Sequence, residues 1–83
     1  MKKESMVFDS TRYFRVQPFA AGGTIMRVDN IVVDYDDVSI NFQTNDGLSQ
    51  YNPVTEEILA SVLRKIKRGI KKDEEIIDIS KWI

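Results

Sequence analysis

The sequence contains neither histidine nor cysteine among its 83 residues. Without these residue types the chain has no thiolate nucleophile, no imidazole base and none of the usual ligands of a zinc site. Disulfide bonds are excluded as well. Most familiar hydrolase designs therefore cannot be built from this chain. We expect a protein that is not an enzyme and that uses no cofactor, metal or small-molecule substrate.

Long apolar runs are also missing. No stretch approaches the roughly 20 apolar residues that a membrane span requires, and residues 1–5 lead into a mixed segment without the apolar stretch of a signal peptide. A chain this short holds one core, because it buries only about 60 to 65 per cent of the surface that its unfolded form exposes. We expect residues 1–83 to form one cytoplasmic domain. Chains of this kind are common among phage and mobile-element products, and we expect such an origin.

The net charge of −1 hides an uneven distribution along the sequence. Between Val28 and Leu63 there is no lysine or arginine, and all the charged residues are acids: Asp29, Asp34, Asp36, Asp37, Asp46, Glu56 and Glu57. All the charged residues from Arg64 to Lys72 are cations. Two poles of opposite charge could each attract a different partner.

Two polar pairs, Asp29-Asn30 and Asp36-Asp37, stand where the apolar alternation of the middle segment reverses. Such pairs are typical of two-residue hairpin loops. Because side chains alternate between the faces of a strand, only one register keeps apolar residues opposite one another. It pairs Tyr35 with Val38, Val33 with Ile40 and Ile31 with Phe42 across the second loop, and Val28 with Ile31 and Met26 with Val33 across the first. The pattern predicts an antiparallel meander.

An earlier strand is predicted over residues 12–18, with Pro18 at its end or at an edge position. Residues 20–23, Ala-Ala-Gly-Gly, then form a flexible loop. Antiparallel pairing of this strand with residues 24–28 places Val16 opposite Met26 and Phe14 opposite Val28. Four strands then share one apolar face.

A third polar turn, residues 44–47, ends the last of these strands, and the assignment of residues 48–51 stays open. A helix follows, with two candidate N-caps: Asn52, with Pro53 at the first helical position, or Thr55 one turn later. Glu56 and Glu57 put negative charge near the positive end of its dipole. Its apolar stripe consists of Ile58, Leu59, Val62, Leu63, Ile66 and Ile70. Gly69 either ends the helix or is tolerated near its end.

Residues 76–83 form a further apolar segment. Their β-branched side chains favour a strand, and a closing helical turn over residues 78–82 is the alternative. Trp82 either closes the edge of the core, which we favour, or projects as an anchor for another subunit.

Together these elements predict an α+β fold, in which a meander of about four strands carries one amphipathic helix across its apolar face and a C-terminal segment at an edge. A meander followed by a helix is similar in layout to the positive-cofactor-four group of single-stranded-DNA-binding coactivators. The central strands here are acidic, unlike the Lys- and Arg-rich strands that such binding needs, so the similarity concerns topology alone and transfers no residue.

One carboxylate cluster, Asp34, Asp36 and Asp37, is a candidate for binding a hard cation or for acid-base chemistry. Its spacing lacks the glycine and the distal glutamate of an EF-hand loop. Aspartates in a hairpin loop are explained by the turn itself. We therefore expect no metal site and no catalytic carboxylate pair.

Candidate partner-binding residues lie on two predicted surfaces. The outward face of the first two strands carries Tyr13 and Arg15, with Arg15 opposite Arg27, and such groups bind single-stranded nucleic acid on other sheets. Asp29 and Asp34 on that face would repel phosphates. The polar side of the helix carries Arg64, Lys65, Lys67, Arg68, Lys71 and Lys72. These cations could bind nucleic acid, an acidic protein or an anionic membrane, or simply form a solvated face that complements the helix dipole.

The leading hypothesis is a small non-enzymatic binding or regulatory protein that docks onto another macromolecule, above all a protein, or onto itself. The alternative is a single-stranded nucleic-acid-binding module that uses Tyr13, Arg15 and Arg27 together with the helix cations.

Overall fold

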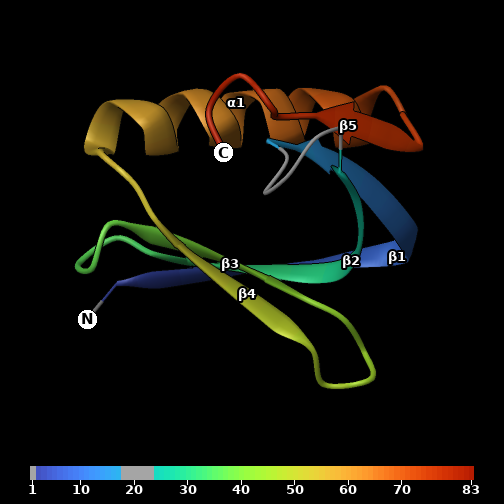
Figure 1. The fold of residues 1–83 in the computed structure, drawn as a ribbon, viewed down its shortest axis with the longest axis horizontal. Coiled ribbons are helices and arrows are strands. Elements are labelled where there is room, and N and C mark those ends of the chain that lie inside the picture. The colour runs from blue at the N-terminus through green and yellow to red at the C-terminus, as the bar shows by residue number, and fades with distance from the viewer. Residues whose placement is uncertain (1, 18–23) are drawn as a thin grey trace.

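A computed structural model gives the fold and describes residues 2–17 and 24–83. In these ranges the elements are β1 (Lys3–Val16), β2 (Thr24–Asp34), β3 (Ser39–Gln43), β4 (Ser49–Pro53), α1 (Glu56–Lys71) and β5 (Ile76–Asp78). The strands form one sheet in the order β4-β3-β2-β1-β5, antiparallel except for the parallel pair of β1 and β5. Helix α1 covers one side of this sheet (Figure 1). The predicted α+β fold is confirmed, and its first four strands form a meander.

The second predicted hairpin is present in the predicted register. Val33 pairs with Ile40, and Ile31 pairs with Phe42. Tyr35 and Val38 belong to the connecting turn rather than to the strands. The carboxylate of Asp34 holds this turn, because its Oδ1 accepts the backbone N–H groups of the next two aspartates at 3.0 Å each. The side chain of Asp34 therefore has a structural role in the turn.

The first predicted hairpin is wrong, because β2 runs without interruption through Asp29 and Asn30. The reversal of the apolar pattern is real, but a bulge accommodates it. Val7 of β1 pairs with Asn30 and Arg12 pairs with Val28, so residues 8–11 of β1 have only Asp29 opposite them. The two strands bend at this bulge, and the second half of β1 rises toward α1 (Figure 1). The predicted contacts of Val28 with Ile31 and of Met26 with Val33 therefore do not form.

The carboxylate of Asp29 is the anchor of the bulge, and only 6% of this residue is exposed. It accepts hydrogen bonds from the backbone N–H of Asn45 at 2.8 Å, from Thr11 Oγ1 at 3.0 Å and from Arg27 Nη2 at 3.2 Å. These donors come from the β3–β4 turn, from β1 and from β2 itself. The hydrogen bond from Asn45, with those from Thr11 and Arg27, lowers the pKa of Asp29 against the opposing effect of its burial.

Replacing Asp29 by asparagine should lower the melting temperature at neutral pH, and this difference from the wild type should shrink in acid. A carboxylate whose pKa is depressed in the folded state stabilises the fold above its unfolded pKa of about 3.9, and the contribution is lost as the pH falls through the folded pKa. Circular dichroism melts at about pH 7 and about pH 2.5 measure the effect. A difference of the same size at both pH values would contradict the proposed anchor.

The pairing of the first strand is antiparallel as predicted, but its register is shifted. Val16 lies opposite Thr24, and Phe14 lies opposite Met26. A shift of two residues keeps every side chain on its face, so the apolar pattern does not distinguish the two registers. The strand also begins at Lys3, well before residue 12. The predictions for Pro18 and for residues 20–23 lie outside the described residues.

Helix α1 begins after Thr55, whose Oγ1 accepts the N–H of Ile58 at 3.2 Å. The alternative cap at Asn52 is wrong, because Asn52 and Pro53 belong to β4. At the other end, Asp73 adopts a left-handed conformation (φ 55°), and its N–H bonds to the carbonyl of Ile70 at 3.0 Å. The N–H of Glu74 reaches the carbonyl of Gly69 at 2.9 Å, which completes a Schellman motif. Gly69 therefore lies inside the helix and does not end it.

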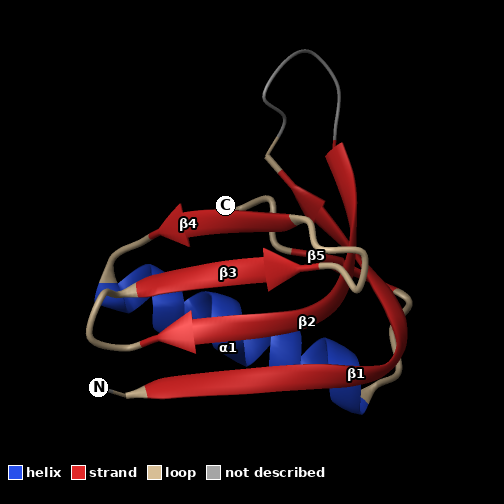
Figure 2. Cartoon of the chain, turned by 90° about the horizontal axis from the view of Figure 1, so that it is seen from below, coloured by secondary structure: helices blue, strands red, loops and turns tan. Residues whose placement is uncertain are grey.

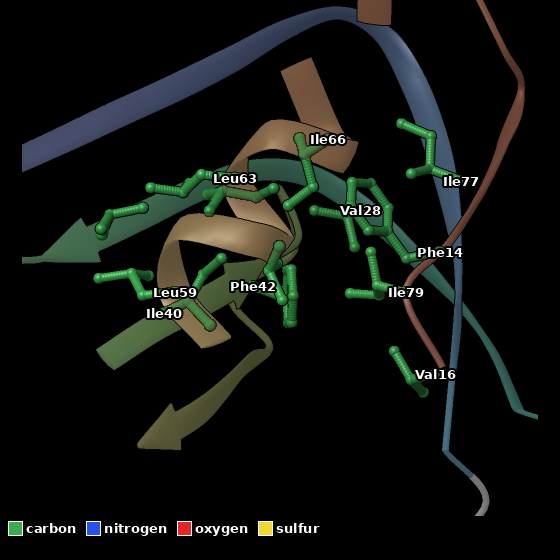
Figure 3. Close-up of a cluster of buried hydrophobic side chains, with 13 residues drawn as sticks. Phe14, Val16, Val28, Ile40, Phe42, Leu59, Leu63, Ile66, Ile77 and Ile79 are labelled. Atoms are coloured by element: carbon green, nitrogen blue, oxygen red, sulfur yellow. The ribbon is translucent and has the colours of Figure 1, made fainter. Parts of the chain in front are cut away.

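The core lies between the concave side of the sheet and α1 (Figure 3). Its buried side chains are Phe14, Val16, Val28, Ile31, Val33, Ile40, Phe42, Leu59, Val62, Leu63, Ile66, Ile77 and Ile79. The strand predicted for the C-terminal segment is present but short, since β5 covers only residues 76–78, and residues 80–82 form a turn rather than the alternative helical turn, with the N–H of Trp82 bonded to the carbonyl of Ile79 at 3.0 Å. Trp82 packs half-buried against the core. Within the described ranges, no helix has the length and apolarity to cross a membrane.

Candidate functional site

The solvent side of α1 carries a cluster of cations that the sequence predicts. Arg64, Lys67, Arg68, Lys71 and Lys72 are exposed and line one shallow hollow of about 610 Å³. We call these five residues the basic face. They gather because α1 turns its apolar stripe toward the sheet, which leaves the opposite side to water.

Ion pairs distinguish most of the basic face from four cations elsewhere on the molecule. Away from the basic face, four cations lie near carboxylates: Lys3 Nζ is 3.9 Å from Asp34, Arg12 Nη2 is 2.8 Å from Asp73, Arg15 Nε is 4.0 Å from Asp78, and Arg27 Nη2 is 3.2 Å from Asp29. On the basic face, Lys67 Nζ lies 3.7 Å from Glu4. Among the described residues, no carboxylate lies within 4.0 Å of the charged groups of Arg64, Arg68, Lys71 or Lys72. These four cations therefore form a cluster with no carboxylate beside their charged groups in the part of the chain that the structure describes.

Lys65 is not part of this cluster, although the sequence places it on the same side of the helix. It is half-buried and does not line the hollow. Its charge acts on Asp78, whose pKa is lowered mainly by hydrogen bonds from the hydroxyl and backbone N–H of Ser80, and to a smaller extent by Arg15 and Lys65. Five of the six predicted helix cations therefore line one hollow.

The outward sheet surface does not assemble as the sequence predicts. Tyr13, rather than Arg15, lies opposite Arg27. Arg15 is close to Asp78 and Arg27 is bound to Asp29, so carboxylates already neutralise both guanidinium groups in part. None of the three residues lines the hollow of the basic face. Trp82 lies elsewhere again, in a cleft of about 280 Å³ between Val16, Ile83 and β4.

The carboxylates of the β2–β3 turn also have protein partners. The side chain of Asp37 accepts a hydrogen bond from the hydroxyl of Tyr51. This bond, with one from Ser39, lowers the pKa of Asp37, and the bond to Asp37 raises the pKa of Tyr51. The side chain of Asp36 accepts the backbone N–H of Lys2 at 2.8 Å. In residues 2–17 and 24–83 no three acidic side chains are arranged to hold a metal ion.

Comparison with known proteins adds no relative. No protein-family model, curated protein or solved structure matches this chain. The functional case therefore depends on the surface chemistry of this chain alone.

One surface was missed by the sequence predictions, the first half of β1. Its residues alternate, with Met6 and Phe8 packed against the core while Ser5 and Val7 are exposed. This period of two was the available signal. It is weak, because the polar N-terminal residues dilute it, and the strand was therefore predicted to begin only at residue 12.

Proposed function

We propose that this is a non-enzymatic binding protein that docks onto an acidic surface of another protein through the basic face of α1. The observation that carries the proposal is the set of four cations, Arg64, Arg68, Lys71 and Lys72, that have no carboxylate within 4.0 Å among the described residues. Elsewhere on the molecule, four cations, Lys3, Arg12, Arg15 and Arg27, lie beside carboxylates.

The spacing of these cations suits an acidic partner. Residues three and four apart on a helix are neighbours, with about 5 to 6 Å between their Cβ atoms. This is less than the Debye length of about 8 Å at physiological salt, so the charges act as one patch. A patch of this kind steers encounter with an oppositely charged surface and disfavours partners of the same sign.

An acidic protein fits the surface better than a nucleic acid does. The hollow is lined by lysine and arginine alone, without an aromatic side chain on which a base could stack. Arg15 and Arg27, which would have extended the binding track, lie beside carboxylates. The chain as a whole carries a net charge of −1, whereas nucleic-acid-binding domains are usually strongly basic.

The test is titration of the protein with a fluorescently labelled peptide rich in aspartate and glutamate, at about 50 mM and about 200 mM salt. Binding should weaken with salt. The double variant Arg68→Glu/Lys71→Glu should raise the Kd by about tenfold or more, since it removes two cations and adds two repulsive charges. Lys65→Glu and Lys81→Glu are matched controls outside the basic face, and we expect them to change the Kd by less than about threefold.

Three results would overturn this function. The first is an equal loss of affinity in the variants and the controls, and the second is no binding at either salt concentration. The third is tighter, more salt-dependent binding of a single-stranded oligonucleotide than of the peptide under the same conditions, which would favour the nucleic-acid alternative.

A further inference from the structure

One edge of β1 is closed along its second half and open along its first half. The C-terminal segment covers the second half: the N–H of Tyr13 bonds to the carbonyl of Glu75 at 3.0 Å, and the N–H of Ile79 bonds to the carbonyl of Arg15 at 2.9 Å. Strand β5 pairs only with residues 13–15 of β1. Among the described residues, no other strand lies beside the first half of β1, which forms a border of the sheet (Figure 2).

The register of β1 and β2 shows which backbone groups face this border. The N–H of Tyr35 bonds to the carbonyl of Lys2 at 2.9 Å, which makes these two a hydrogen-bonded antiparallel pair. Because such pairs alternate with non-bonded ones, the N–H and C=O groups of Lys3, Ser5 and Val7 point away from β2. They form a row of free donors and acceptors that another strand could use.

The opposite border of the sheet is protected. Strand β4 is five residues long, and the same alternation along its pairing with β3 turns Ser49, Tyr51 and Pro53 outward. Pro53 has no N–H to offer, and proline at such a position is a common guard of an edge strand. Between Lys3 and Asp9 the open border of β1 contains no proline. The border of β1 therefore keeps all of its outward N–H donors, whereas that of β4 does not.

The side chains of this border in one copy of the chain are complementary to those of the same border in a second copy. In an antiparallel arrangement of two copies with Met6 opposite Met6, the outward-facing pairs are Ser5 with Val7 and Lys3 with Asp9. Asp9 is exposed and, among the described residues, has no cation within 4.0 Å. A shift by two residues in one direction sets Lys3 against Val7, and in the other direction sets Asp9 against Ser5. Charge pairing therefore selects one register.

We propose that two copies of this chain pair along the first half of β1, antiparallel and in this register, to form a homodimer with a continuous ten-stranded sheet. Ser5 and Val7 of the two copies exchange backbone hydrogen bonds, and the exposed Val7, 77% of which faces water in the single chain, gains a cross-strand neighbour. On the other face, the two Met6 side chains meet beside the core.

The symmetry of this pairing has a consequence for the helices. The two-fold axis runs through the Met6 pair at right angles to the sheet, so both α1 helices lie on the same side of the continuous sheet. The dimer therefore presents two basic faces toward one partner surface. The pairing itself does not depend on the binding role proposed above, because it involves only β1.

The test is sedimentation equilibrium from roughly 5 µM to 500 µM protein, where the chain of 9.6 kDa should shift from monomer to dimer. Lys3→Asp and Asp9→Lys, each alone, should raise the dimer Kd about tenfold, because each places like charges opposite one another twice. The combined variant Lys3→Asp/Asp9→Lys should return the Kd to within about threefold of the wild type. Asp46→Lys, an exposed charge reversal away from this border, is the control and should leave the Kd unchanged.

Recovery in the combined variant is the diagnostic result, since loss of folding in a single variant would not be repaired by the second change. The proposal is overturned if the protein is still a monomer at the highest concentration, or if neither single charge reversal changes the dimer Kd. A monomer is also the result expected if this border pairs only with a strand of a different protein. Arg68→Glu/Lys71→Glu should keep the dimer intact while losing the acidic peptide, so the two proposals fail independently.

Discussion

Replacing Phe14 by alanine should lower the free energy of unfolding by about 3 to 5 kcal/mol, the range for removing a fully buried aromatic side chain. No part of Phe14 is exposed. Its ring centroid lies 5.5 Å from that of Phe42 and 6.1 Å from that of Phe8. Phe14 stands after the bulge of β1, so its ring joins the bent half of the β1–β2 pair to the core beneath α1 (Figure 3). The cavity left by alanine would open at this junction.

This loss is large for a chain of 83 residues, whose whole stability is on the order of 4 to 12 kcal/mol. The melting temperature should fall by at least about 12 °C, at about 4 to 8 °C per kcal/mol for a domain of this size. Urea unfolding followed by circular dichroism measures the change. Leu48→Ala is the control, because this side chain is 68% exposed and its removal should cost less than about 0.5 kcal/mol. If Phe14→Ala and Leu48→Ala have similar urea midpoints, the assignment of Phe14 to the centre of the core is wrong.

The faces of the elements could be predicted from the sequence because they depend on local periodicity. A period of two places Ile31 opposite Phe42, and a helical period places Val62 and Ile66 toward the sheet. These assignments survive errors of register by two residues, as the pairing of Phe14 with Met26 shows. They also identify the basic face, since its cations lie opposite the apolar stripe.

The bulge could not be predicted, because the groups that hold it are distant in the sequence. Asp29 and Asn30 carry the residue types of a hairpin loop. What keeps β2 continuous is the set of donors to the Asp29 carboxylate, and one of them, the N–H of Asn45, lies 16 residues along the chain. A local pattern shows that the alternation of apolar and polar residues reverses. It does not show whether the chain reverses direction in a hairpin or continues through a bulge.

The candidate site was likewise predictable only in part. The clustering of Arg64, Arg68 and Lys71 follows from helix geometry alone. The partial neutralisation of Arg15 follows from Asp78, which reaches it because β5 pairs in parallel with β1. No short-range pattern predicts a parallel pair between segments some sixty residues apart. The sequence therefore suggested more uncompensated positive charge on the outward sheet surface than the structure has, whereas the cluster of cations on the helix was predicted correctly.

At Gly69, α1 and β5 approach each other closely. The sequence left open whether this glycine ends the helix or is tolerated near its end. It is buried in the last turns of α1, next to the side chain that β5 inserts into the core. A Cβ atom at this position would lie 2.8 Å from Cγ1 and 3.0 Å from Cδ1 of Ile77. Ile77 is fully buried, so its side chain has no free space into which it could move. The missing side chain is what lets β5 pack against α1.

Gly69→Val should therefore destabilise the fold by about 2 to 3 kcal/mol through overpacking, even though glycine is a poor helix former. The matched control is Ala60→Val, which adds the same side chain at an exposed position of α1 and should cost only about 0.5 kcal/mol. A double-mutant cycle identifies the cause. Ile77→Ala alone should cost about 2 to 5 kcal/mol, and it should cost about 1 to 2 kcal/mol less when Gly69→Ala is already present, because the new methyl group then occupies part of the space that Ile77 leaves. Urea unfolding of the four proteins of the cycle gives this coupling, and purely additive effects would show that Gly69 and Ile77 do not meet.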